Sequence, residues 1–147
     1  MSTPNSLYAV DTVAVRRPVP AVGVVCLRGR EVLLIRRSRP PLSGAWSLPG
    51  GRIEWGERSA DAALRELTEE TGVQAELTGL LDVVDGVFGE DAHYVLVDYA
   101  ARWIAGEPEA GDDAAEAAFH PLDALDTLGL WEETRRIILM AALLAEE

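Results

Sequence analysis

Three glutamates are crowded into a short stretch in the middle of the chain. Glu66, Glu69 and Glu70 stand three and one residues apart. At about 100° per residue, a helix places them within roughly 100° of arc on one face. Like charges at i and i+4, such as Glu66 and Glu70, destabilise a helix by roughly 0.2–0.5 kcal/mol. A hard divalent cation, Mg²⁺ or Mn²⁺, prefers carboxylate oxygens and would turn this repulsion into a binding site.

The spacing alone also permits a solvated acidic helix face. The chain carries 25 acidic and 13 basic residues, for a formal charge of −12, so acidic surfaces are expected.

Arg65, next to the first of these glutamates, also has two interpretations. It follows Asp61 by four residues and precedes Glu69 by four, a spacing that forms surface ion pairs. Its guanidinium could instead hold one carboxylate in place through a bidentate contact.

A helix must position these side chains, and the sequence marks both of its ends. Ser59 is a good N-cap residue and Gly72 a good residue at the C-terminal end. The small and apolar residues between them recur at helical spacing and form a stripe roughly 125° from the glutamates. The helix can therefore bury one side and present the carboxylates on another; the stripe contains Ala60, Ala63, Leu64, Leu67 and Thr71.

A run of Pro49, Gly50 and Gly51 stands just before the helix. We expect it to end a short strand over Ala45–Leu48 and to bring backbone close to the start of the helix. Carbonyl groups exposed there could serve as metal ligands, although the same residues are common in simple tight turns.

The rest of the chain reads as strands interleaved with two helices, which predicts a layered α/β or α+β domain. β-Branched and alternating runs indicate strands. Pro, Gly and acidic clusters indicate loops. We expect a strand hairpin from Ala21–Leu27 and Glu31–Arg36, strands at Val73–Val84, Tyr94–Ala101 and Ala117–His120, loops at Ser38–Gly44, Asp85–Asp91 and Glu107–Asp113, a short helical piece from Pro121, and a helix at Glu132–Leu144.

The N-terminal end differs in composition from the rest of the chain. Residues 1–7 are polar, and Tyr8–Val15 alternates weakly, as an edge strand or a dimer contact would. We therefore divide the chain into an N-terminal segment, 1–17, and one domain, 18–147; the 147 residues suit a single domain with a sizeable core.

Composition excludes several function classes. All 13 basic residues are Arg and there is no Lys, so neither a phosphate-binding loop ending in Gly-Lys nor a Schiff-base lysine is possible. The strong negative charge disfavours binding to nucleic-acid polymers. The chain has a single cysteine, Cys26, which excludes an intramolecular disulfide and a multi-cysteine zinc site. We expect Cys26 to be a small buried apolar residue.

His93 and His120 stand too far apart to form a metal-spaced pair, and we expect structural roles for both. The longest wholly apolar run, Ile137–Ala145, has nine residues against the roughly 20 that cross a bilayer, so no membrane span is expected. We predict a cytoplasmic location, in line with the low cysteine content.

The 23 residues from Gly51 to Val73 resemble the Nudix box, G-x5-E-x7-R-E-U-x-E-E-x-G-U, in which U is a bulky apolar residue. Every defined position matches. The flanking runs RPPLSGAWSLPGG and GDDAAEAAFHPL are similar to Nudix sequences of the ADP-ribose pyrophosphatase-like kind. The matching residues are Gly51, Glu57, Arg65, Glu66, Leu67, Glu69, Glu70, Gly72 and Val73.

The resemblance implies an α/β fold, an α/β/α sandwich with a mixed β-sheet between helices. It implies divalent-metal-dependent hydrolysis of the pyrophosphate bond in a nucleoside diphosphate linked to another moiety, such as ADP-ribose, with Mg²⁺ or Mn²⁺ as cofactor. Glu66, Glu69 and Glu70 would hold the metal, and the carbonyl of Gly51 or Gly50 could add a ligand. Arg65 would orient a box glutamate, Glu57 would brace the loop onto the helix, and Gly72 would be structural.

A glutamate would accept the proton of the attacking water, and Glu69 or Glu66 is the candidate base. Some members of the family use an acid outside the box. The candidates here are Asp112, Asp113 and Glu116, with Glu116 first and also a candidate metal ligand. Each of the three could equally be a loop residue that only interacts with solvent.

Substrate contacts are expected from arginines near the box and from aromatic residues. Arg36, Arg37, Arg39 and Arg52 are concentrated there in an otherwise acidic chain; Arg37 and Arg52 are the candidates for phosphate binding. Four aromatic residues could stack on a base, with Trp46 as the candidate, although Trp46 is also a good core residue. The four are Trp46, Trp55, Phe88 and Tyr94.

Two alternatives remain. A (d)NTP pyrophosphatase would use the same box, because the box makes the catalytic machinery and not the base pocket. A noncatalytic nucleotide-binding module would typically have lost box carboxylates, all of which are present here. The expected partners are a small nucleotide substrate and a second copy of the chain in a homodimer, since apolar strand edges need covering; neither a nucleic-acid polymer nor a membrane is expected.

Overall fold

The computed structural model describes residues 16–40, 43–111 and 113–146. The segment Tyr8–Val15 and Asp112 lie outside these residues, so the interpretations placed on them stay predictions. In chain order the elements are β1 (Val19–Arg28), β2 (Glu31–Arg37), β3 (Trp46–Ser47), β4 (Gly50–Arg52), α2 (Ser59–Thr71), β5 (Gln74–Phe88), β6 (Ala92–Ala105), β7 (Ala114–Pro121), the 3₁₀ helix η1 (Leu122–Thr127) and α3 (Glu132–Ala145).

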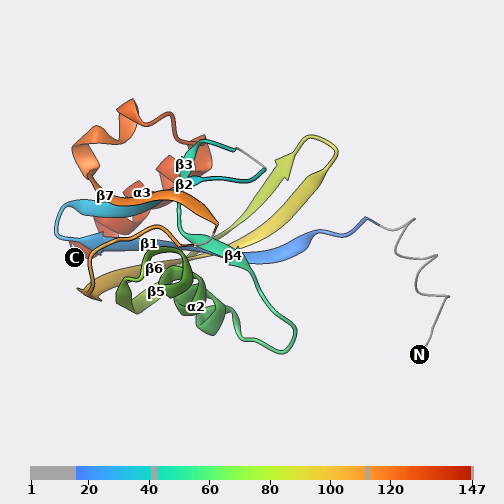
Figure 1. Ribbon diagram of the computed structural model, residues 1–147, viewed down its shortest axis with the longest axis horizontal. Coiled ribbons are helices and arrows are strands. Elements are labelled where there is room, and N and C mark those ends of the chain that lie inside the picture. Colours follow the sequence, from blue (N-terminus) through green and yellow to red (C-terminus); the bar gives the residue numbers. More distant parts are fainter. Residues whose placement is uncertain (1–15, 41–42, 112, 147) are drawn as a thin grey trace.

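The strands of the described residues form one seven-stranded sheet (Figure 1). Its main path runs β3-β2-β1-β6-β5, while β4 also pairs with β1 and β7 with β2. The long pairing of β1 with β6 is parallel, and the other pairings are antiparallel. The sheet is therefore mixed, as expected.

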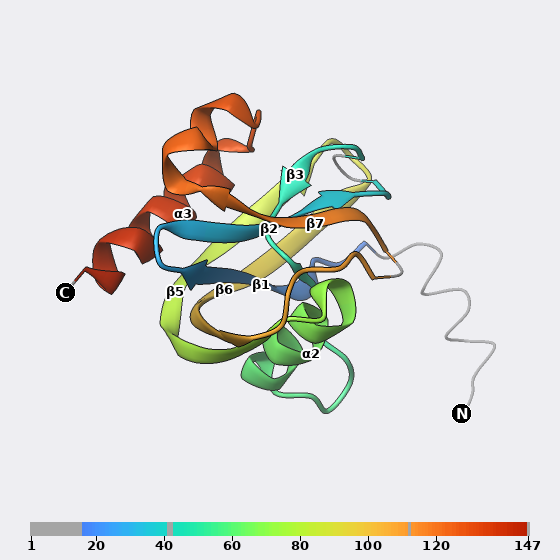
Figure 2. The same ribbon diagram turned by 60° about the vertical axis from the view of Figure 1, so that its left-hand side comes forward.

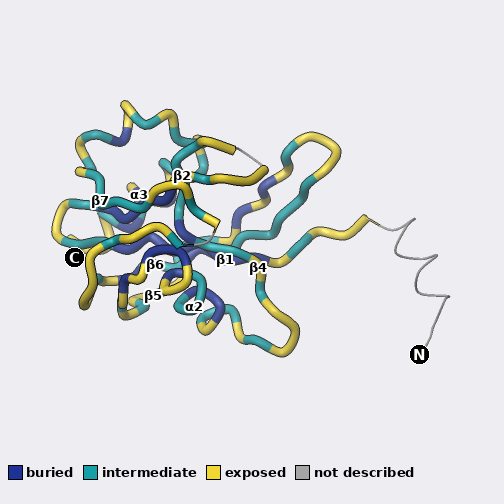
Figure 3. Tube along the Cα trace, viewed as in Figure 1, coloured by how far each residue is buried: buried dark blue, intermediate teal, exposed yellow. Residues whose placement is uncertain are grey.

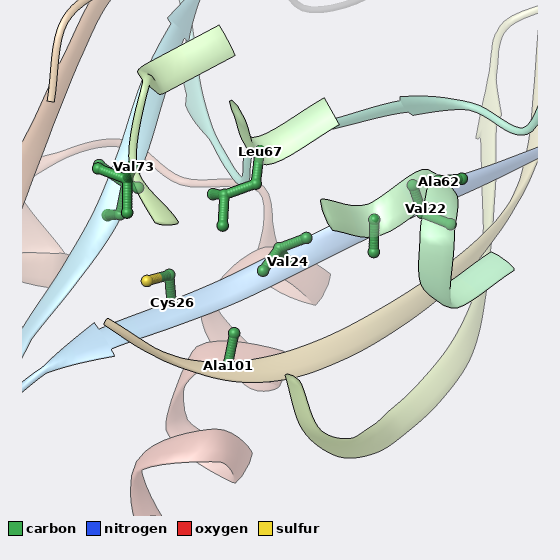
Figure 4. Close-up of a cluster of buried hydrophobic side chains, with 9 residues drawn as sticks. Val22, Val24, Cys26, Ala62, Leu67, Val73 and Ala101 are labelled. Atoms are coloured by element: carbon green, nitrogen blue, oxygen red, sulfur yellow. The ribbon is translucent and has the colours of Figure 1, made fainter. Parts of the chain in front are cut away.

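Helices cover both faces of this sheet, because the side chains of its central strands alternate between two buried layers. Val22, Val24 and Cys26 of β1 pack in one cluster with residues of α2 (Figure 4). Val25 of β1 packs in a second cluster with residues of α3. Figure 2 shows the two helices on opposite sides of the sheet, and Figure 3 shows the buried positions gathered on the central strands and the inner faces of the helices. The α/β sandwich is confirmed.

β1 changes partners along its length. Leu27 and Arg28 pair with the start of β2, so the predicted hairpin is correct only at its tip. The earlier half, Ala21 to Gly23, pairs with β4. Gly50 and Gly51 were expected to form a turn that ends the short strand before them, and this part of the prediction was wrong, because they pair with β1 as the strand β4.

Helix α2 begins differently from the prediction and ends as predicted. Arg58 occupies the N-cap position without a side-chain cap, and the hydroxyl of Ser59 instead lies 2.6 Å from that of Tyr99 on β6. Gly72 ends the helix with φ 72°, a left-handed conformation that glycine adopts without strain.

Strands β5 and β6 are longer than predicted and meet at a short turn around Gly89, so most of the expected loop Asp85–Asp91 is strand. The strand β7 likewise begins three residues earlier than expected. Within the described residues, no helix is long and apolar enough to cross a bilayer.

Candidate active site

Arg65 joins the loop before α2 to the helix itself. Its Nε donates to Glu57 Oε2 at 2.7 Å and its Nη2 to Glu57 Oε1 at 2.9 Å, a bidentate contact. The same Nη2 donates to the carbonyl of Arg52 at 3.1 Å. Glu57 Oε1 also accepts from the backbone N–H of Glu54 at 3.0 Å. These bonds, led by those from Arg65, lower the pKa of Glu57 to about 2, so Glu57 is an ionised brace between loop and helix.

The remaining nitrogen of Arg65 contacts two of the crowded glutamates. Nη1 donates to Glu66 Oε2 at 2.9 Å and to Glu69 Oε2 at 3.3 Å. One guanidinium thus donates hydrogen bonds to three carboxylates, and it also lies 3.6 Å from a carboxyl oxygen of Glu54. This arrangement orients the carboxylates more firmly than isolated surface ion pairs would.

Glu70 does not lie on a solvated face with Glu66 and Glu69. Only 8% of it is exposed, and its Oε1 accepts a hydrogen bond of 2.7 Å from the backbone N–H of Gly50 on β4. Burial, with the charge of Glu66 adding to it, raises the pKa of Glu70 to about 7 despite that hydrogen bond. The pairing of β4 with β1 carries the Gly50 amide to the last turn of α2 and so creates this contact.

Gly51 is the second close approach between β4 and α2. A Cβ atom placed on Gly51 would lie 2.5–2.7 Å from the carboxyl group of Glu66, so only glycine leaves that carboxyl its place. The Glu66 side chain is 15% exposed against 58% for Glu69. Burial raises the pKa of Glu66, although Arg65 lowers it.

The loop before β7 adds another acidic residue, Asp113, to the cavity that Glu66 and Glu70 line. The backbone N–H of Glu109 donates to the carbonyl of Thr71, and that of Gly111 to the carbonyl of Glu70, both at 2.9 Å. These bonds satisfy carbonyls at the end of α2. They hold the loop so that Asp113 lines the same cavity as Glu66.

The cavity has a volume of about 560 Å³ and receives side chains from both layers of the sandwich. From the α2 side come Glu66 and Glu70, and from the α3 side come Trp131 and Thr134. Three arginines face it together with the acids, so its polar part can meet both a cation and phosphate oxygens; they are Arg37, Arg39 and Arg52. Its apolar part includes Phe88, Tyr94 and Leu96.

Comparison with known proteins decides the family. The model of the NUDIX domain matches residues 17–141. The chain belongs to the Nudix hydrolase family. An ADP-ribose pyrophosphatase of Methanocaldococcus jannaschii is 36% identical over 117 residues, which cover 79% of this chain and 69% of that protein. A Mycobacterium tuberculosis protein provisionally named an 8-oxo-dGTP diphosphatase is 38% identical over 90 residues, covering 60% and 64%.

The chain thus spans about two thirds of the length of both relatives. Among solved structures, the MutT Nudix hydrolase of Burkholderia pseudomallei has a TM-score of 0.77 and 33% identity, covering 85% of this chain and 98% of that one. The Nudix domain of Shewanella oneidensis NrtR, in complex with ADP ribose, has the same TM-score with 23% identity, covering 97% and 99%, and it supports the fold. The predicted family, fold class and enzyme assignment are confirmed.

The structure gathers some residues singled out in this Nudix sequence and separates others. Glu66, Glu70, Gly51, Arg37 and Arg52 all line the cavity. Glu69 is not among the lining residues; its side chain is 58% exposed and contacts Arg65.

Two further candidates have other partners. Glu116, on β7, pairs with Arg36 at 2.7 Å and is half exposed, which favours a surface ion pair over metal binding. Trp46 packs edge-on against His120, with ring centroids 4.5 Å apart, beside the α3 core cluster. These contacts favour the core interpretation of Trp46.

Trp55, another candidate for stacking on a base, is fully exposed and does not line the cavity.

The donors at the Nudix site suit a hard divalent cation. Glu66, Glu70 and Asp113 line one cavity and offer only oxygen, and the pKa of Glu66 and of Glu70 is raised by burial and by neighbouring negative charge. A cation would relieve that repulsion. As the side chains lie, no three of the described His, Cys, Asp or Glu residues surround a common point; Arg65 holds Glu66 and Glu69 instead.

Several cavity residues were not predicted from the sequence, and Asp98 and Trp131 are two of them with side chains able to contact a substrate. Asp98, on β6, is 5% exposed and lines the cavity from its α3 side. The available signal was an acid at an inward position of the otherwise apolar run Tyr94–Ala101.

Proposed function

We propose that this Nudix hydrolase cleaves the pyrophosphate bond of a nucleoside diphosphate linked to another moiety, with ADP-ribose as the first substrate to test and Mg²⁺ or Mn²⁺ as cofactor. The observation that carries the proposal is the contact of one guanidinium, Arg65, with Glu57, Glu66 and Glu69 beside the buried Glu70. The name of the archaeal relative supports the choice of ADP-ribose.

Each side chain of the site has a proposed role in binding or catalysis. Glu66, Glu70 and Glu69 would hold the cation, which when bound offsets phosphate charge and lowers the pKa of a bound water. Arg65 fixes the direction of Glu66, and the Gly50 amide fixes that of Glu70. Arg37 and Arg52 would receive the diphosphate oxygens. A carboxylate oxygen of Glu66 or Glu69 would accept the proton of the attacking water.

A (d)NTP pyrophosphatase is the second candidate, and the provisional name of the mycobacterial relative supports it. Both activities would share the box and differ in the part of the cavity that holds base and sugar. A noncatalytic binding module is disfavoured, because every box carboxylate is present.

Incubation with candidate nucleotides and Mg²⁺ tests the proposal. ADP-ribose should yield AMP and ribose 5-phosphate, whereas 8-oxo-dGTP should be cleaved at least about tenfold less efficiently, a ratio set by contacts in the base and sugar pocket. The reverse preference would favour the (d)NTP pyrophosphatase. Binding of both nucleotides without any product would favour the noncatalytic module.

The homodimer and the cytoplasmic location stay predictions. Leu80, Val83 and Val87 on β5, the last strand of the sheet path, are 52–61% exposed, which supports an apolar contact surface there. The formal charge of −12 supports a small nucleotide rather than a nucleic-acid polymer as substrate.

A further inference from the structure

Asp98 is a buried acid in the middle of the sheet whose carboxyl group has no described partner. It lies opposite Gly23 of β1 and Asp82 of β5, and only 5% of it is exposed. Neither a hydrogen bond nor an ion pair reaches it from residues 16–40, 43–111 or 113–146. Buried carboxyl groups are normally paired. The oxygens of Asp98 are not among the fully enclosed side-chain atoms that lack a hydrogen-bond partner, so they reach the cavity that Asp98 lines, where a ligand can supply the missing bond.

The neighbouring strand makes room for this carboxyl group. A Cβ atom on Gly23 would collide with Asp98 Oδ1, so a side chain of any size at position 23 would displace the acid. Leu96 and Ala100, two residues to either side of Asp98, pack in the α3 cluster. The carboxyl group therefore faces the α3 layer, where it lines the cavity.

Arg136, the arginine whose charge acts on Asp98, already has two partners. Arg136 of α3 binds Asp82 and Glu133, each at 3.0 Å. Burial, together with the charges of Asp82 and Glu133, raises the pKa of Asp98 to about 7, and Arg136 lowers it only in part. Asp98 is thus available to a ligand rather than held within the charge network beside it.

The cavity around Asp98 suits a flat heterocycle. Phe88 and Trp131 line it with ring centroids 5.2 Å apart, and Tyr94 and Leu96 add apolar surface. Aromatic rings of this kind bind the faces of a nucleobase. A ribose would expose several hydroxyl groups to this apolar surface, which favours the base as the occupant.

We propose that Asp98 is the residue that reads the base of the substrate, by accepting a hydrogen bond from the exocyclic amino group of an adenine. This inference rests on the proposed function for the identity of the substrate but concerns binding, not catalysis. Asp98 is therefore a specificity residue, and the remaining carboxyl oxygen is free to meet a ring nitrogen when the acid is protonated.

Calorimetric binding of two monophosphates tests it: AMP and the purine riboside monophosphate that lacks only the amino group. The wild-type chain should bind AMP about tenfold tighter or more, because the analogue leaves a buried carboxyl group unpaired. Asp98→Ala should bring the two dissociation constants to within about twofold, and Asp98→Asn, whose amide oxygen still accepts, should keep the preference. Each ratio is taken within one variant, so a partly unfolded sample does not mimic the result.

Asp85→Ala is the matched control, since it removes an acid of β5 that contacts His93 rather than Arg136 and lies outside the cavity lining. It should leave the preference for AMP unchanged. Equal binding of both monophosphates by the wild type, no binding of either, or an undiminished preference in Asp98→Ala would each overturn the inference. Failure to hydrolyse ADP-ribose with intact discrimination in binding would instead overturn the proposed function alone.

Discussion

The backbone N–H of Gly50 donates a hydrogen bond of 2.7 Å to Glu70 Oε1. This bond ties the strand that begins the box to the last turn of its helix. A main-chain donor loses no side-chain rotamer freedom, so it fixes the Glu70 carboxyl group more firmly than a flexible side chain would. The site is built where a glycine-containing strand meets a helix, and the predictions below probe that junction.

Gly51→Ala should impair catalysis while preserving the fold. The new methyl group would meet the carboxyl group of Glu66 at 2.5–2.7 Å and force this side chain to move. Because only the end of a flexible side chain must shift, we expect a folded protein whose turnover falls at least about tenfold, a range typical of a small displacement of catalytic groups. Gly79→Ala, with open space around its Cβ position, is the control in a turnover assay. Unchanged turnover in Gly51→Ala would show that the position of Glu66 is not critical.

Arg65→Lys should slow turnover although it keeps the charge. A lysine cannot reproduce the bidentate contact with Glu57 together with the bonds to Glu66 and the Arg52 carbonyl. We expect kcat to fall by about tenfold or more and KM to change little, since Arg65 positions a glutamate rather than binding substrate. A larger effect on KM than on kcat would assign Arg65 to substrate binding instead.

Glu69→Gln should lower turnover at least ~10²-fold, the lower range for removing a general base. It relieves like-charge repulsion on the helix but also removes the charge that pairs with Arg65 at 3.3 Å. These two contributions to stability oppose each other, so the stability of the metal-free protein should stay within a few tenths of a kcal/mol of the wild type. Steady-state kinetics and urea unfolding measure the two effects, with Glu132→Gln on α3 as the control. Glu69 lies outside the cavity lining, so retention of more than about a tenth of the wild-type turnover would pass the role of base to Glu66.

Asp98→Asn should change how stability depends on pH. The pKa of Asp98 is raised from 3.8 to about 7, mainly by burial. Between these values the folded state binds more protons at this site than the unfolded state, so its contribution is complete below about pH 4 and is lost as the pH rises to about 7. One pKa unit corresponds to about 1.4 kcal/mol, so the free energy of unfolding of the wild type should fall by a few kcal/mol at most relative to the variant. Urea unfolding between these pH values measures the difference, and parallel curves would contradict the burial of an ionisable Asp98.

The helix, its end at Gly72 and the crowding of its glutamates could be predicted because they depend on local periodicity. The burial of Glu70 could not. It depends on the pairing of β4 with β1, which are distant in sequence. Gly50 and Gly51 locally favour a turn, but in the structure they form a strand whose Gly50 amide contacts Glu70. The prediction of Ser59 as the N-cap was wrong for a similar reason, because its hydroxyl group contacts that of Tyr99 on a strand distant in sequence.

The choice among acids outside the box also depended on tertiary structure. Glu116 was preferred from its place beside a strand, but it pairs with Arg36, while Asp113 reaches the cavity. The loop is held by backbone bonds from Glu109 and Gly111 to the end of α2. Hydrogen bonds between backbone groups do not depend on side-chain type, so the sequence does not indicate where this loop is held.

We infer that the box carboxylates act through a divalent cation. The most direct test is the rate of AMP release from ADP-ribose in Mg²⁺, measured before and after an excess of chelator. We expect the rate to fall to background with chelator and to return when excess Mg²⁺ or Mn²⁺ is added, since a site with only oxygen donors suits these ions better than Zn²⁺. An equal rate in excess chelator would contradict the account.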